Sequence, residues 1–338
     1  MFDFLAYFSV AFFISSCVTP MVRRWANLLD LVDHPGERKV HERVRARLGG
    51  CAIAFSFLTC LFLVALLHRS SSALFIPLQE GNPYEVIRTH PFGTRFFAAA
   101  LIVFLTGAWD DWQGATATVK LLWQIIAAFI VLWGQSKFGI LQSFGCGGEA
   151  VAYLDLLIGI FWVIYVCNAF NLIDGLDGLA SGTAFFSCMG LFSLATAAEN
   201  SALALLILLL AGAVLGFLQY NRYPARIFMG DSGSLFIGFC LAVFSLRLCC
   251  TYAPIGLLVF APLIAIGLPL ADTTLAIVRR WLLHSGVLSS NRPRKLLCIR
   301  EIFTADKEHI HHRMLAVTGK QKRAVNYFYT INFLLFVV

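Results

Sequence analysis

Long apolar runs constrain this chain more than any other feature of its sequence. They cover residues 4–22, 49–67, 93–109, 119–134, 153–170, 179–197, 201–218, 233–250, 253–278 and 324–338. Most approach the roughly 20 residues that an α-helix needs to cross the hydrocarbon core of a bilayer. Because no water satisfies backbone N–H and C=O groups in that core, helices are the expected structure. The sequence therefore predicts an all-α, polytopic integral membrane protein with about ten transmembrane helices.

The composition supports a membrane-embedded chain rather than a soluble one. Apolar residues make up 59% of the sequence and charged residues only 13%, whereas about a quarter of the residues in a soluble domain are charged. We therefore expect one membrane-embedded domain over residues 1–338. The first run, 4–22, has no basic segment before it and no cleavage site, so we expect a retained span. The last run stops with the chain after 15 residues, so we expect a clipped span.

The ten cysteines do not indicate a disulfide framework or a zinc site. Most lie inside the apolar runs, and they form no CxxC pair and no repeated spacing. We interpret them as small buried hydrophobic side chains.

Basic residues are distributed unequally between the two predicted sides of the membrane. The loops after the first, third, fifth, seventh and ninth runs hold 21 Lys and Arg residues, and the remainder of the chain holds five. Because positive loops stay in the cytoplasm, these loops are predicted to be cytoplasmic and the N-terminus external, in the inner (plasma) membrane. The net charge of +7 is thus explained by topology and anionic headgroups, and we expect no nucleic acid partner.

Polar and small residues gather in the same five basic loops, whereas the opposite loops have nothing comparable. The five segments are Asp33–His41, Asp110–Lys120, Asn168–Gly178, Asn221–Ser234 and Asp306–His312. This asymmetry predicts one site that is assembled from five loops at the inner face.

Carboxylates in two of these segments have both a functional and a structural interpretation. Asp110 and Asp111 are adjacent, and their mutual repulsion favours a nearby cation, although a solvated helix end is the alternative. Asp174 and Asp177 are three residues apart and would share one face of a helix. With Asn171 beside them, we favour a functional site over a helix cap with small-residue packing.

The remaining clusters indicate phosphate and a hard cation. The segment Gly230–Ser234 opens the eighth run, where backbone N–H groups form a natural phosphate seat and Asp231 could hold a cation. The segment His309–His312 has no Cys or carboxylate at a recognised zinc spacing, and its neighbouring arginines suit phosphate, although a solvated loop is the alternative. Oxygen ligands select Mg²⁺ or Mn²⁺. Together these residues suit phosphoryl transfer between a soluble nucleotide and a lipid.

Four motifs give the chain a specific resemblance. They are Asp110-Asp111, Asn-Leu-Ile-Asp-Gly-Leu-Asp-Gly-Leu-Ala at 171–180, Phe-Met-Gly-Asp-Ser-Gly-Ser at 228–234, and His309-Ile310-His311-His312. In these residues, in this order, the chain resembles the polyprenyl-phosphate N-acetylhexosamine-1-phosphate transferases, which are membrane enzymes of ten or eleven helices. The form of the histidine motif resembles the subgroup that transfers GlcNAc-1-phosphate and starts O-antigen, enterobacterial common antigen or wall teichoic acid.

The resemblance implies an activity. A sugar-1-phosphate, most closely GlcNAc-1-phosphate, would pass from a UDP-sugar to polyprenyl (undecaprenyl) phosphate at the cytoplasmic face. The products would be polyprenyl-diphospho-sugar and UMP, in the first membrane step of a cell-surface polysaccharide pathway.

The resemblance also implies roles for individual residues. The catalytic residues would be Asp110, Asp111, Asn171 and Asp174. Asp231, with Asn171, would bind Mg²⁺, with Mn²⁺ as a substitute. The donor's uridine would be bound by Gly175, Leu176, Asp177 and the ring of Phe228. Lys120 and Asn221 would surround the phosphates, and the sugar would be recognised by His309, His311 and His312.

Some alternatives remain open at this stage. Residues 282–300 look like an inserted cytoplasmic segment close to the sugar-recognition motif, so another UDP-sugar, such as N-acetylfucosamine, N-acetylquinovosamine or a galactose, is the first alternative. A membrane transporter is the second, although transporter sites lie near the bilayer midplane and these carboxylates lie at span ends. An inactive scaffold is the third, and the complete acidic set argues against it. A homodimer is a further expectation.

Overall fold

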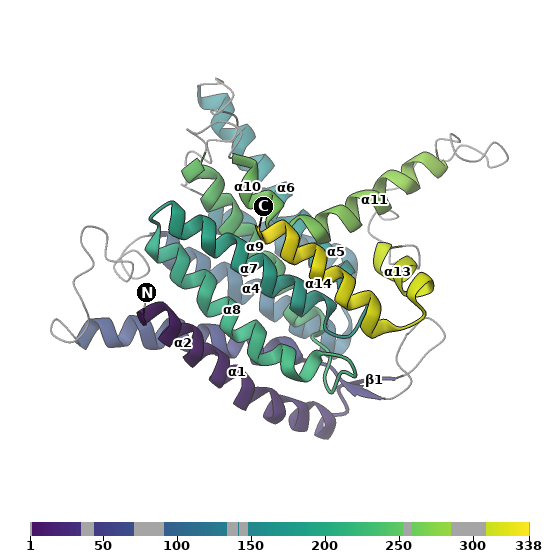
Figure 1. The fold of residues 1–338 in the computed structure, drawn as a ribbon. Coiled ribbons are helices and arrows are strands. Elements are labelled where there is room, and N and C mark those ends of the chain that lie inside the picture. Colours follow the sequence, from purple (N-terminus) through teal and green to yellow (C-terminus); the bar gives the residue numbers. More distant parts are fainter. Residues whose placement is uncertain are drawn as a thin grey trace.

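The computed structural model describes residues 2–34, 44–70, 91–133, 141, 148–252, 259–284 and 309–337, and within them the chain is a helical bundle (Figure 1). The helices are α1 (Phe2–Leu28), α2 (Gly49–Ser70), α4 (Pro91–Gln113), α5 (Ala117–Leu132), α6 (Glu149–Ile173), α7 (Leu179–Ala197), α8 (Ser201–Asn221), α9 (Gly230–Tyr252), α10 (Ala261–Ile264), α11 (Gly267–His284), α13 (Ile310–Thr318) and α14 (Gln321–Val337). Two short strands, β1 (Val32–Asp33) and β2 (Arg45–Ala46), form an antiparallel pair.

Helix α9 is the centre of the bundle. About 89% of its apolar window is buried, compared with 17% for α1, and it packs against α2, α4, α6 and α7. The outer helices expose large apolar side chains, such as Phe13 on α1 and Phe161 on α6. In a soluble protein such surfaces would be unfavourable, but lipid is as apolar as these side chains. This difference in burial between α9 and the outer helices agrees with a membrane protein. The start of α9 is surrounded by other helices.

Six of the described helices are long and apolar enough to cross a membrane, namely α1, α4, α6, α7, α8 and α9. Shorter apolar helices cover Gly49–Val64 within α2 and Ala117–Leu132, which is α5. The prediction of an all-α, multi-pass membrane protein is confirmed, but the described residues support six spans and not the count of about ten.

The ninth apolar run, 253–278, is not one continuous helix as predicted. Within its described part, α10 ends at Ile264 and α11 begins at Gly267. Pro269 lies in the first turn of α11, where its missing N–H is tolerated but where it could not continue a helix from α10. As a result α11 points away from the bundle (Figure 1). The proposed insertion at 282–300 falls outside the described residues after His284.

The segment before α2 is bonded to the segment before α9. Ala46 forms a parallel bridge with Ile227 and accepts a hydrogen bond from Phe228 N at 2.9 Å. Gly49 N and Gly50 N then donate to the carbonyl oxygens of Phe228 (2.9 Å) and Met229 (2.8 Å). These bonds place Arg47 close to the start of α9.

Two glycines allow α4 to approach the start of α9. A Cβ at Gly107 on α4 would collide with the backbone carbonyl of Asp231. Gly230 has a φ of +72°, which disfavours any L side chain, and a Cβ there would collide with the carboxylate of Asp111. The close approach brings the last turn of α4 and the first turn of α9 into direct contact.

Candidate active site

The two adjacent acids at the end of α4 have different partners. Asp111, whose side chain is fully buried, accepts hydrogen bonds from Asp231 N at 2.9 Å and Ser232 N at 3.0 Å. These are N–H groups of the first turn of α9, which have no partner inside their own helix. Asp111 thus caps α9 from another helix.

Asp110 instead belongs to a group of charges around Lys120. The Lys120 Nζ lies 2.8 Å from Asp231 Oδ2 and 3.4 Å from Asp110 Oδ2. The other oxygen of Asp110 accepts a hydrogen bond from Ala115 N at 2.7 Å, which fixes the turn between α4 and α5. The lysine therefore bridges two carboxylates that would otherwise repel each other.

Asn171, in the last turn of α6, completes this group. Its Nδ2 donates to Ser234 Oγ at 3.0 Å, and it lies within hydrogen-bonding reach of Asp231. Asp231 is thus surrounded by Asp110, Lys120 and Asn171, which come from three different helices. The structure brings these four predicted site residues together.

Asp174, directly after α6, faces the same group of charges. Burial, and then the negative charges of Asp231 and Asp111, raise the pKa of Asp174 to about 7, while Arg47 partly opposes the shift. Burial and the neighbouring carboxylates thus both favour the protonated form of Asp174.

Arg47 was predicted only as one of the basic residues of the first loop, with no role in the site. Its guanidinium lies 3.5 Å from Asp111 Oδ1. Only the tertiary bonds between β2 and the segment before α9 bring it there, so no local signal could have identified it.

The acidic group is chemically suited to a divalent cation. In the part of the chain that the structure describes, the four carboxylates of Asp110, Asp111, Asp174 and Asp231 lie near two cationic side chains, those of Lys120 and Arg47. Carboxylate and amide oxygens are the ligands that Mg²⁺ prefers. Asp110 and Asp231 bring carboxylate oxygens together at Lys120, and Asn171 lies beside Asp231, so the chemistry of these residues fits a hard divalent cation such as Mg²⁺. We name these residues, with Asp111, Lys120 and Asp174, the acidic cluster.

Two residues predicted to contact the donor have contacts within the protein. Asp177 Oδ2 accepts a hydrogen bond from Ala225 N at 2.8 Å. Asn221 is buried, where its Nδ2 donates to the Ile227 carbonyl at 3.0 Å and its Oδ1 accepts from Ser181 Oγ at 2.7 Å. Both side chains support the loop between α8 and α9, and their predicted substrate contacts stay predictions.

The other predicted uridine residues lie in two neighbouring loops. Gly175 is exposed, Leu176 is buried, and Phe228 is half-buried next to the start of α9. The backbone of Phe228 is held by its hydrogen bonds with Ala46 and Gly49.

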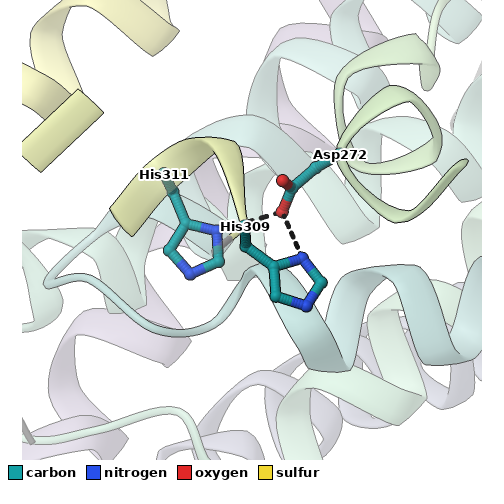
Figure 2. A group of neighbouring side chains, drawn as sticks. All are labelled: Asp272, His309 and His311. Atoms are coloured by element: carbon teal, nitrogen blue, oxygen red, sulfur yellow. Dashed lines mark hydrogen bonds and ion pairs between the residues drawn. The ribbon is translucent and has the colours of Figure 1, made fainter. Parts of the chain in front are cut away.

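The histidine motif forms a second cluster with an acid that the sequence reasoning missed (Figure 2). Asp272 Oδ2 on α11 lies 3.0 Å from His311 Nδ1 and 3.2 Å from His309 Nδ1. All three side chains are buried, and their ligand atoms lie close enough to hold a metal ion. The signal that could have revealed Asp272 was a carboxylate inside a predicted apolar run, which is costly without a function. We name Asp272, His309 and His311, with His312, the histidine cluster.

The two clusters meet at Gly175. A Cβ on Gly175 would lie 2.7 Å from His311 Nε2, and Gly175 directly follows Asp174 of the acidic cluster. The rings of His311 and His312 lie 4.4 Å apart between centroids. One elongated site therefore has carboxylates at one end and imidazoles at the other.

A large apolar cavity lies elsewhere, between α1, α2 and α4. Its volume is about 990 Å³, and its walls are apolar side chains such as Phe55, Phe62 and Phe97. Because its walls are apolar, it suits hydrocarbon rather than a nucleotide.

Comparison with known proteins identifies a family. Residues 94–249, which contain every residue of the acidic cluster, match the model of glycosyl transferase family 4. A Bacillus subtilis protein named as a probable undecaprenyl-phosphate N-acetylglucosaminyl 1-phosphate transferase is 33% identical over 96% of this chain and 82% of its own length.

Other relatives have related names. A Mycobacterium leprae decaprenyl-phosphate N-acetylglucosaminephosphotransferase is 30% identical over 92% of this chain and 77% of its own length. A Limosilactobacillus reuteri phospho-N-acetylmuramoyl-pentapeptide-transferase is 39% identical, but over only 44% of this chain and 49% of its own. With near full-length similarity to the first two and the motifs joined in one site, this chain belongs to glycosyl transferase family 4.

Proposed function

We propose that this protein transfers GlcNAc-1-phosphate from UDP-GlcNAc to polyprenyl phosphate, which yields polyprenyl-diphospho-GlcNAc and UMP. The observation that carries the proposal is the convergence of Asp110, Lys120, Asn171 and Asp231 from four helices. The names of the Bacillus and Mycobacterium relatives support the sugar and the lipid acceptor.

The reaction requires one P–O bond to form and one to break. An oxygen of the lipid phosphate attacks the β-phosphorus of the UDP-sugar, and the bond from that phosphorus to the bridging oxygen breaks, so that UMP leaves. A phosphate monoester loses its second proton near pH 6, so most of the acceptor is already a dianion at pH 7. Since a loose phosphoryl-transfer transition state needs alignment and charge neutralisation, the protein does not need a strong base.

The acidic cluster has groups for both tasks. Mg²⁺ bound by Asp110, Asn171 and Asp231 would neutralise the charge of the diphosphate, and Mn²⁺ could replace it. Lys120 lies between the two carboxylates and can donate hydrogen bonds to phosphate oxygens. Asp111 binds the first turn of α9 and so fixes the position of Asp231 beside Asp110 and Lys120.

We propose the finer topology from the charge pattern. The chain would form one membrane-embedded domain of about ten spans, in which α2, α5, α10 with α11, and α14 complete the six longer helices. The acidic cluster would face the cytoplasm at the inner (plasma) membrane, where UDP-sugars are available. A homodimer is part of the same proposal.

The decisive experiment identifies the lipid product. Membranes that contain the protein are incubated with labelled UDP-GlcNAc and undecaprenyl phosphate, and the product lipid is analysed by mass. We expect a diphospho-linked HexNAc lipid and release of UMP, both absent with the Asp231→Asn variant. Product formation with another UDP-sugar but not UDP-GlcNAc would correct the sugar, and release of no UMP from any UDP-sugar would reject the reaction.

A further inference from the structure

A single carboxylate organises the histidine cluster. Asp272 uses Oδ1 to accept a hydrogen bond from Ile310 N at 2.6 Å, and its Oδ2 lies 3.0 Å from His311 Nδ1 and 3.2 Å from His309 Nδ1. The relative exposures of Asp272, His309 and His311 are 3%, 3% and 1%. A buried carboxylate is costly unless it is paired, and here its partners among the described residues belong to one short motif.

The contact with Ile310 replaces a cap that α13 does not have. The residue at the N-cap position of α13 is His309, which makes no side-chain capping bond. The free N–H groups of the first turn need an acceptor, and Asp272 supplies it from α11. The start of α13, which carries the histidines, is therefore attached to α11 by this side chain.

The contact with His311 determines which of its ring nitrogens faces the predicted binding site of the UDP-sugar. Because Nδ1 points at the Asp272 carboxylate, which can only accept, Nδ1 carries the ring proton and donates a hydrogen bond to that carboxylate. The other nitrogen, Nε2, then lies next to Gly175, in the loop that also contains Asp174. A flipped ring would place a carbon there instead.

The environment of His309 is consistent with the same arrangement. Its Nδ1 lies near Asp272 but outside hydrogen-bonding geometry, and its Nε2 has no hydrogen-bond partner within the described residues. A buried imidazole without a partner is unfavourable. A hydroxyl or phosphate oxygen of a bound substrate would satisfy it.

We propose that Asp272 is a positioning residue that orients His309 and His311 toward the sugar-phosphate half of the donor, without itself contacting substrate. The inference rests on the proposed function, since it names the part of that reaction's donor that the histidine cluster binds. Asp272 acts through His311, so its effect should disappear once His311 is removed.

The test uses purified full-length protein in detergent, with two readouts. The first is kcat/KM for UDP-GlcNAc, and the second is binding of UMP, which lacks the sugar. In the Asp272→Asn variant the amide oxygen can still cap α13, but the charge opposite the imidazoles is lost. We expect kcat/KM to fall at least about tenfold, the range for residues that orient functional histidines, with unchanged UMP binding and partial recovery in Asp272→Glu.

A double-mutant cycle separates positioning from folding. If Asp272 acts through His311, the double variant of Asp272→Asn with His311→Ala should be no worse than His311→Ala alone. Asp155→Asn is the matched control, since Asp155 is also a buried carboxylate in an apolar helix and accepts a backbone N–H, that of Leu141, at 3.2 Å. It should leave kcat/KM unchanged.

Three results would overturn the inference. The first is additive losses in the double variant, and the second is a loss of UMP binding that parallels the loss of activity. The third is a stoichiometric transition metal that leaves the protein in Asp272→Asn, because Asp272, His309 and His311 would then be metal ligands. Absence of turnover in the unmodified protein, with intact UMP binding, would reject the proposed function instead, and the two failures are therefore distinguishable.

Discussion

Asp111 on α4 accepts a hydrogen bond from the backbone N–H of Asp231 on α9, 120 positions later in the chain, at 2.9 Å. Its second oxygen accepts from Ser232 N at 3.0 Å. A carboxylate at a helix N-terminus satisfies free N–H groups and interacts favourably with the helix dipole. The two neighbouring acids therefore have different roles, because Asp111 fixes the position of Asp231 whereas Asp110 forms an ion pair with Lys120.

These different roles predict that replacing the two acids affects stability and activity differently. Asp111→Asn replaces one acceptor with an amide NH₂ that would face a backbone N–H, so we expect a loss of about 1–3 kcal/mol in stability together with reduced activity. Asp110→Asn should lose activity with little change in stability. Thermal unfolding of both variants in detergent, beside transfer assays, measures the difference. Equal Tm values for the two variants would contradict the capping role.

The pH profile of Asp110→Asn tests whether Asp110 acts as a general base. If it did, the variant should recover as pH rises from about 6 to 9, because the lipid phosphate then ionises unaided. We expect instead a nearly constant loss and a shifted Mg²⁺ requirement, since alignment and charge are the main needs. The measurement is the transfer rate of variant and unmodified protein across that range. Strong alkaline recovery would reject the positioning role.

Removal of the metal should stop the reaction. We expect EDTA to abolish transfer by the unmodified protein and added Mg²⁺ or Mn²⁺ to restore it. Asp231→Asn keeps the size of the side chain but removes its charge, so most activity should be lost even at high Mg²⁺ concentration. Asp155→Asn, a buried carboxylate outside the acidic cluster, is the control and should keep its activity. Undiminished turnover in EDTA would exclude the metal.

Asp174 should make Mg²⁺ affinity depend on pH. Its pKa is raised to about 7 by burial and neighbouring carboxylates, so the side chain gains a proton and loses its charge as pH falls below 7. A bound divalent cation favours the charged form, and proton and metal therefore compete. We expect apparent Mg²⁺ affinity to be about tenfold weaker at pH 6 than at pH 8. In Asp174→Asn the pH dependence of Mg²⁺ affinity should be smaller. The same pH dependence in the variant and the unmodified protein would show that Asp174 is not the group responsible.

The proposed topology can be tested with two cysteines of the native sequence. Cys146 lies in a loop predicted to be external, and Cys298 lies in a predicted cytoplasmic loop. In sealed cells an impermeant thiol reagent should label Cys146, and Cys298 should react only after permeabilisation. Single-cysteine variants with the other nine thiols replaced would give clean readouts. Labelling of Cys298 from outside would contradict the topology that was predicted from the distribution of basic residues.

Much of this protein could be predicted from the sequence because the relevant signals are local. Hydropathy over about 20 residues identifies a helix wherever the run is uninterrupted, as for α6 and α8, because each backbone bond in lipid forms within the helix. The signal failed in the run at 253–278, where proline and glycine separate α10 from α11. The motif residues of the acidic cluster were likewise recognisable, since carboxylates and amides at the ends of apolar runs are rare.

Only the tertiary structure decided which of these residues act together. Asp272 was hidden inside an apolar run, and its partners His309 and His311 lie almost 40 positions later. Nor did the sequence distinguish Asp111 from Asp110, because two adjacent acids have the same local signal. Their partners depend on how closely α4 approaches α9, and that distance is set by the packing of side chains around Gly107 and Gly230. Helix packing of this kind joins residues that are distant in the chain, so no local pattern records it.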